Sequence, residues 1–188
     1  MGRHAPSVQG SFVTDASPGN RLVWVGTSST VPSIDMTLDL RTHLTIWVGG
    51  ELTPSVYWQL ADPDFSVLEI GLERTTGRAT KLAIPLYRGE LGRRDAAQAP
   101  PDVEGMPAFD VGAWQPVARS TAGDFKEVFG RIRIDVDRDG WWTITMFDDE
   151  VVHHVGVPGL LSCGLNSRKE LSRFSVNVAR SHSSPGLG

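Results

Sequence analysis

The sequence predicts an all-β protein, mostly antiparallel, that folds as a sandwich or an open barrel from two similar five-strand units with little helix. Three observations support this fold class. Apolar residues recur at every second position in many short segments. Consecutive segments match one another as hairpins, and the order of the segments repeats in the two halves of the chain. Twenty Gly and twelve Pro among 188 residues supply the many turns that such a fold needs.

Alternation over 36–40 and 44–48 predicts the first hairpin. In an antiparallel hairpin, the position numbers of facing residues have a constant sum. The apolar pairs with one common sum are Leu40 with Leu44, Leu38 with Ile46, and Met36 with Val48. This register places one apolar face inward and the loop at residues 41–43.

A second hairpin follows from the same arithmetic. Its facing pairs are Leu72 with Leu82, Ile70 with Ile84, and Leu68 with Leu86. The turn is centred on Gly77. On the other face Glu73 is expected opposite Lys81, as a stabilising cross-strand pair of opposite charge.

The third hairpin has a short loop that ends in glycine. Its facing pairs are Val136 with Trp142, Ile134 with Ile144, and Ile132 with Met146. Gly140 occupies the position where a three-residue hairpin loop favours the left-handed backbone conformation.

The remaining strands complete two units, at residues 34–88 and 130–179, within a single β domain of residues 21–180. These strands are expected at residues 21–25, 55–60, 151–155, 160–165 and 173–179. Residues 89–129 form a loop-rich connection in which Asp124 is expected to cap a short helix over 125–129. Residues 1–20 read as a flexible arm and 181–188 as a flexible tail.

Charge and composition exclude several classes of function. The formal net charge is −4 and no run of Lys or Arg is longer than two residues, so a nucleic-acid partner is not expected. No apolar stretch reaches the length of a membrane span or of a signal peptide, so the chain is expected to be cytoplasmic and to have no membrane partner. Cys163 is the single cysteine, which excludes an internal disulfide.

No motif predicts catalysis, a metal or another cofactor. Residues 135–140, DVDRDG, match the first half of an EF-hand loop, but Met146 stands where the bidentate Glu is required. The hairpin explains this glycine without calcium, although calcium binding is left open. His153 and His154 alternate on a strand and point to opposite faces, and Cys163 is expected to be buried and inert.

The candidate binding residues are aromatic and acidic side chains expected on outer faces or in turns. They are Trp47, Asp135, Asp137, Trp141, Asp148, Asp149 and Glu150. Exposed tryptophans beside carboxylates are typical of interfaces and of sugar-binding platforms. The alternative for the tryptophans is that two packed sheets bury both of their faces.

The stretch VLEIGLERTTGRATKLAIPLYRGEL, within residues 67–91, resembles a hairpin in small uncharacterised bacterial β-rich proteins, some of which look like immunity proteins. The matching residues are Leu68, Glu69, Ile70, Gly71, Thr76 and Gly77. The resemblance implies a protein-binding role and carries no catalytic residue.

The favoured function is therefore a non-enzymatic protein-binding protein, most concretely an immunity protein that neutralises a cognate bacterial toxin of basic charge. The first alternative is a carbohydrate-binding or small-molecule-binding β module that uses Trp47 or Trp141. The second alternative is an enzyme with a non-standard site, whose signature is a pocket lined by His153 or His154 and a carboxylate. The oligomeric state is left open.

Overall fold

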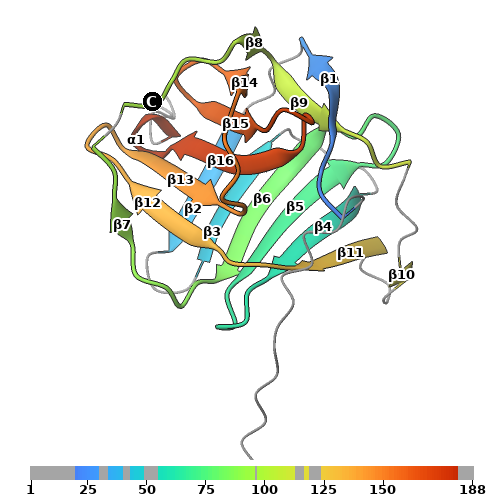
Figure 1. Cartoon of the computed structure of the whole chain (residues 1–188), viewed down its shortest axis with the longest axis horizontal. Coiled ribbons are helices and arrows are strands. Elements are labelled where there is room, and N and C mark those ends of the chain that lie inside the picture. The colour runs from blue at the N-terminus through green and yellow to red at the C-terminus, as the bar shows by residue number, and fades with distance from the viewer. Residues whose placement is uncertain are drawn as a thin grey trace, which may run out of the picture.

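The computed structural model describes residues 20–29, 34–39, 43–48, 55–95, 97–112, 117–118 and 124–181. This part of the chain forms two seven-stranded sheets, a two-stranded ribbon and the four-residue helix α1, Val178–Ser181 (Figure 1). The predicted all-β, mostly antiparallel sandwich with little helix is confirmed.

The first sheet contains the N-terminal unit. Its strands, in spatial order, are β10 (Val117–Ala118), β11 (Asp124–Phe129), β4 (Ser55–Ala61), β5 (Val67–Glu73), β6 (Ala79–Leu86), β3 (His43–Val48) and β2 (Ile34–Asp39). All neighbours are antiparallel except β11 and β4, which run parallel.

The second sheet contains the C-terminal unit. Its strands, in spatial order, are β7 (Gly92–Arg93), β12 (Arg133–Val136), β13 (Trp141–Thr145), β16 (Leu171–Asn177), β15 (Leu161–Leu165), β14 (His153–Val157) and β8 (Val103–Glu104). The two edge strands β7 and β8 run parallel to their neighbours, and the five central strands are antiparallel.

The two five-strand units have the same strand order. The first unit is arranged β2-β3-β6-β5-β4 and the second β12-β13-β16-β15-β14. Each unit is a hairpin followed by a three-strand meander, and the last strand of the meander lies beside the second strand of the hairpin. This is a Greek-key arrangement. The prediction of two similar five-strand units is confirmed at the level of topology.

The inward side chains of both sheets form one core. Its largest fully buried members include Trp58, Leu60, Ile70, Ile84 and Ile134. On β5, β6, β12 and β13, the isoleucines predicted from alternation to point inward are at most 2% exposed. They are Ile70, Ile84, Ile134 and Ile144. Period-two alternation therefore identified the buried faces of these strands correctly.

The predicted hairpin registers have different outcomes. In the third hairpin Val136 pairs with Trp142 and Ile134 with Ile144, and Gly140 has φ of 81°, as predicted. In the first hairpin the prediction is wrong by two residues, because Leu38 pairs with Leu44. A shift of two residues keeps every side chain on the same face, so alternation fixes the face of a strand but not its partner.

The second hairpin is also shifted, and its ladder is irregular. Ile70 pairs with Leu82, and the register changes between Gly71 and Leu72. The predicted pair of Glu73 with Lys81 is therefore wrong. The Lys81 Nζ lies 2.7 Å from the Glu69 carboxylate, and Glu73 pairs with Arg78 instead.

Three local expectations are corrected. Residues 125–129 lie in strand β11 rather than in a helix, because β4 supplies a complete parallel set of partners. The segment 89–129, expected to be loop-rich, contains the five short strands β7 to β11. The strand expected at 151–155 begins two residues later, at His153.

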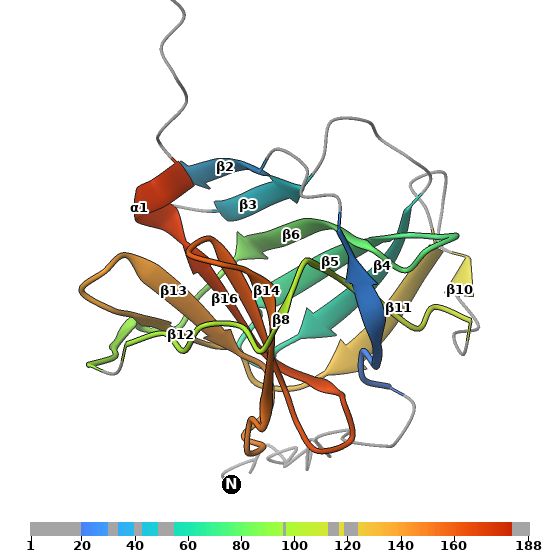
Figure 2. The ribbon, with the colours of Figure 1, turned by 90° about the horizontal axis from the view of Figure 1, so that it is seen from above.

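A ribbon of β1 (Trp24–Ser28) and β9 (Met106–Phe109) closes one side of the sandwich (Figure 2). Each of its strands contacts the turn of the opposite unit. Before β1, Val23 forms a bridge with Glu170 in the second unit, and Ala108 of β9 forms a bridge with Arg78 in the first. Thus β1, which precedes the first unit, contacts the β15–β16 turn of the second unit. Likewise β9, which precedes the second unit, contacts the β5–β6 turn of the first.

Candidate functional site: an arginine cleft on the second sheet

The outer face of the second sheet carries a row of polar side chains that alternates with the core. Arg133 on β12 pairs in register with Thr145 on β13, which pairs with Arg173 on β16. The intervening residues Ile134 and Phe174 point into the core. Alternation on three adjacent strands thus places two guanidinium groups and a hydroxyl side by side on one face.

The edge strand β7 brings two more arginines to this row. Gly92 pairs with Asp135 of β12, and an added Cβ at Gly92 would lie 2.1 Å from the Asp135 carboxylate. A side chain at this position would displace the Asp135 carboxylate, so glycine lets β7 and that carboxylate lie close together. Arg93 and Arg94 follow directly, and the Arg94 Nη1 donates to the Thr143 hydroxyl at 3.3 Å.

Together these side chains line a cleft of about 250 Å³. Its lining residues are Arg93, Arg94, Arg133, Asp135, Thr143, Thr145 and Arg173. Four arginines against one aspartate leave a formal charge of +3 in the cleft, whereas the whole chain carries −4. The cleft is thus a local concentration of positive charge on an acidic protein.

Most of this positive charge is not neutralised by carboxylates. Asp135 lies 3.2 Å from the Arg133 Nε, and Arg133 also lies 3.7 Å from Asp148. Among the described residues, Arg93, Arg94 and Arg173 have no carboxylate within ion-pair distance. The Nε of Arg173 is buried and has no hydrogen-bond partner in the described part of the chain.

The floor of the cleft is buried. Thr143 and Thr145 are 3% and 4% exposed although they lie on the outer face. The Thr143 hydroxyl lies 3.1 Å from the Ser175 hydroxyl of β16. The connection from β7 to β8 links opposite edges of this sheet (Figure 2) and ends where Asp102 accepts a hydrogen bond from the His154 backbone at 2.8 Å.

His154 reports on the electrostatics of this face. Its pKa is lowered, first by burial and then by the positive charges of Arg94 and Arg173, although Asp102 acts in the opposite direction. His153 is exposed and His154 half-buried, as the alternation predicted. The Nδ1 of His154 lies 3.3 Å from the Ser162 hydroxyl.

Such a set of groups can hold an anion. Guanidinium groups stay protonated in proteins and donate hydrogen bonds in a planar fork that matches carboxylate and phosphate oxygens. Threonine hydroxyls add donors to the same oxygens. Cys163, the one thiol, is fully buried, and burial raises its pKa. The geometry therefore favours binding over chemistry at this place.

The binding residues predicted from the sequence lie in several different environments. Asp135 lines the cleft, and Trp141 is half-buried on the neighbouring strand. The Asp137 carboxylate accepts the backbone N–H groups of Asp139 and Trp141, each at 2.9 Å, and so closes the hairpin loop. In the part of the chain that the structure describes, no three His, Cys, Asp or Glu side chains gather in a metal-binding group.

The three acidic residues of the turn after β13 also lie in different environments. Asp148 and Glu150 are exposed, with the Asp148 side chain 89% accessible. Asp149 instead is half-buried and accepts hydrogen bonds from Arg21 and from Ser172 (3.0 Å). Trp47 belongs to β3 of the other sheet, where it pairs in register with Lys81; its side chain lies outside the described residues.

The four arginines of the cleft were not singled out from the sequence. Arg133 and Arg173 each sit at an outward position of an alternating strand, a signal that the sequence does contain. Their convergence with Arg93 depends on β7 pairing in parallel with β12, which no local pattern encodes.

No family model matches this sequence, and a comparison with curated proteins gives no match. Among the described residues, no helix has the length and apolar character required to cross a membrane.

Proposed function

We propose that the protein is a non-enzymatic binding protein that holds an oxyanion group of a ligand, a phosphate or a carboxylate, in the arginine cleft. The single observation that carries the proposal is the set of three arginines, Arg93, Arg94 and Arg173, around buried threonines with no carboxylate partner among the described residues. Unpaired guanidinium groups are costly when they are partly desolvated. A bound oxyanion supplies the missing acceptors as charge-assisted hydrogen bonds.

Calorimetric titration with inorganic phosphate, sulfate and citrate tests this proposal. We expect saturable binding of one anion per chain, weakened about tenfold or more by Arg173→Met, because a charge-assisted bond is lost. Arg138→Gln is the matched control, because Arg138 lies nearby but is 89% exposed and outside the cleft. Equal weakening by both variants, or no binding beyond that of chloride at the same ionic strength, contradicts the proposal.

Binding of a basic protein partner, including a toxin neutralised in the manner of an immunity protein, is our second candidate. Its support is a cleft of about 260 Å³ beside the arginine cleft, in which Asp95, Asp137 and Asp139 outnumber Arg94 and Arg138. Asp148, at the other end of β13 and 3.7 Å from the Arg133 Nη1, is a further exposed carboxylate. If the protein binds such a partner, we expect Asp139→Asn and Asp148→Asn to weaken binding of the partner. Saturating phosphate is expected to leave that binding unchanged.

A further inference from the structure

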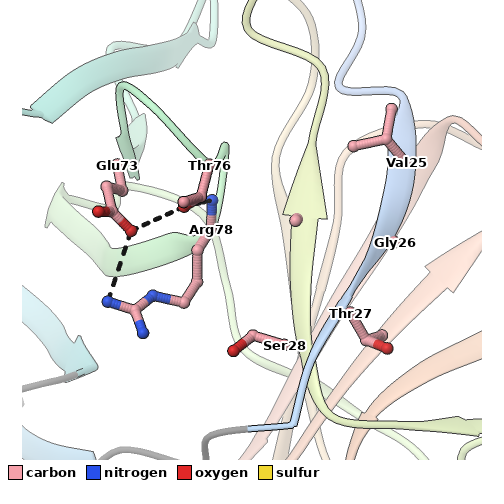
Figure 3. Close-up of a pocket in the computed structure, with 8 residues that line it drawn as sticks. Val25, Gly26, Thr27, Ser28, Glu73, Thr76 and Arg78 are labelled. Atoms are coloured by element: carbon pink, nitrogen blue, oxygen red, sulfur yellow. Dashed lines mark hydrogen bonds and ion pairs between the residues drawn. The ribbon is translucent and has the colours of Figure 1, made fainter.

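A second recess lies where the ribbon meets the turn between β5 and β6 (Figure 3). It has a volume of about 300 Å³, at the lower limit for small-molecule sites. Its lining residues are Val25, Gly26, Thr27, Ser28, Glu73, Thr76, Arg78 and Ala108. The recess and the arginine cleft share no lining residue.

The floor of the recess is formed by two small residues at paired positions. Gly26 of β1 pairs with Ala108 of β9. A Cβ added at Gly26 would meet no atom within 4 Å, and no positive φ accompanies this glycine. Backbone conformation therefore does not require glycine here. Its absence of a side chain is what leaves the space open.

The wall of the recess is a preorganised polar group. The Thr76 hydroxyl donates to the Glu73 carboxylate at 2.7 Å, and the Arg78 Nη2 lies 3.5 Å from the same oxygen. The Arg78 backbone N–H donates to the Thr76 hydroxyl at 3.2 Å, which fixes the turn (Figure 3). The Nε of Arg78 is buried and has no hydrogen-bond partner among the described residues.

The charges of this wall distinguish its ligand from that of the arginine cleft. Glu73 and Arg78 cancel, so the recess has no preference for an anion or a cation. A carboxylate beside a guanidinium offers an acceptor and donors at adjacent points. Hydroxyl groups on neighbouring carbons both donate and accept, and they match such a pair. The Ala108 methyl and the exposed Val25 add apolar contact for the C–H surface of a ring.

The twin junction in the second unit shows that the fold does not by itself create the recess. There the turn between β15 and β16 meets β1 through Arg21, Asn166 and Glu170, which are each at most 7% exposed. Asn166 donates to Glu170 at 2.9 Å, and Arg21 packs against the Phe147 ring at 3.9 Å. The same contact between a ribbon strand and a turn is filled in one unit and open in the other.

We propose that the recess at Gly26 and Ala108 binds a neutral polyhydroxylated ring, one sugar unit, through Glu73 and Arg78. Saturation-transfer NMR and calorimetry on the full chain with glucose, galactose, mannose and N-acetylglucosamine test this inference. We expect at least one of these sugars to bind with a dissociation constant of about 1 mM or lower.

Filling the recess gives the sharpest variant. Gly26→Val places a β-branched side chain in the recess at a strand position that tolerates it, so binding is expected to disappear while stability is retained. Gly112→Val, at an exposed glycine outside the recess, is the matched control and is expected to leave binding unchanged. Arg78→Met is expected to weaken binding about tenfold.

Two results overturn the inference. The first is that none of the four sugars gives saturable binding. The second is that binding survives in a folded Gly26→Val protein. Because phosphate binding at the arginine cleft is measured separately, failure here leaves that proposal standing, and the reverse also holds.

Discussion

The two five-strand units meet the ribbon with the same backbone hydrogen bond but with different side chains. The Trp24 N–H donates to the Lys169 carbonyl, and the Phe109 N–H donates to the Gly77 carbonyl, both at 2.9 Å. Gly77 and Lys169 both have a left-handed backbone, with φ of 69° and 61°. The backbone of the junction is thus repeated, whereas the side chains around it are not.

This difference separates stability from binding. In the second unit the junction carries an ionic network around buried Arg21 and Glu170, in which Asp149 pairs with Arg21 and Glu170 pairs with both Arg21 and Arg168. Removal of Arg21 leaves the Asp149 carboxylate without a counter-charge among the described residues. In the first unit the corresponding polar group, Glu73 with Arg78, faces a recess and is less buried. We infer that the second junction holds the sandwich together and that the first is available for a ligand.

The largest expected effect comes from opening the ionic network. Arg21→Met leaves Asp149 without its cation and leaves Glu170 with Arg168 alone, so we expect a loss of about 3 kcal/mol in the free energy of unfolding. At the other junction Arg78→Met is expected to cost less than about 1 kcal/mol, because the Arg78 and Glu73 side chains are more accessible than those of Arg21 and Glu170. Urea unfolding of both variants measures the contrast. Equal losses from the two would show that the junctions are energetically equivalent.

The next effect concerns the paired left-handed residues. Gly77→Ala adds a Cβ that would lie 1.9 Å from the Phe109 carbonyl oxygen, at a φ that disfavours any side chain. We expect a loss of about 2 kcal/mol in the free energy of unfolding, measured by thermal and urea unfolding.

The matched change in the other unit is Lys169→Gly. It relieves backbone strain but removes the Lys169 Nζ from its position 5.6 Å from the Trp24 ring, so stability is expected to stay within about 0.5 kcal/mol of wild type. A large loss in Lys169→Gly, or none in Gly77→Ala, would break the equivalence of the two junctions.

The comparison also shows which features local patterns encode. The buried faces of β5, β6, β12 and β13 and the left-handed Gly140 follow from alternation and turn chemistry within single hairpins, and both were predicted. The register of the first two hairpins was not, because a two-residue slip preserves the pattern. The last strand, β16, has an irregular step opposite Gly164 that leaves Ser172 without a paired residue on β15, and no local pattern encodes this step.

The arginine cleft and the recess could not be predicted from local sequence patterns, for a related reason. The arginine cleft needs β7 beside β12, and the recess needs β1 beside the β5–β6 turn. Both contacts join segments far apart in the sequence. Among the residues singled out beforehand, Asp135 lies in the arginine cleft, while Asp149 is engaged in the buried network.

The smallest effect we expect is one that depends on pH. Although burial alone would raise the pKa of Asp149, hydrogen bonds from Arg21 and Ser172 outweigh it and lower the pKa. The folded protein therefore binds this proton less tightly than the unfolded chain does. The resulting stabilisation is complete above the ordinary carboxylate pKa and is lost as the pH falls through the lowered value, so the change falls below about pH 4.

Asp149→Asn tests this assignment, because the amide cannot titrate. We expect the stability difference between wild type and Asp149→Asn to be greatest near neutral pH and to shrink as the pH falls below about 4. Asp148→Asn is the neighbouring control, since the Asp148 side chain is 89% accessible. A stability difference for Asp149→Asn that stays constant through the acid range would mean that its carboxylate gains nothing from the network.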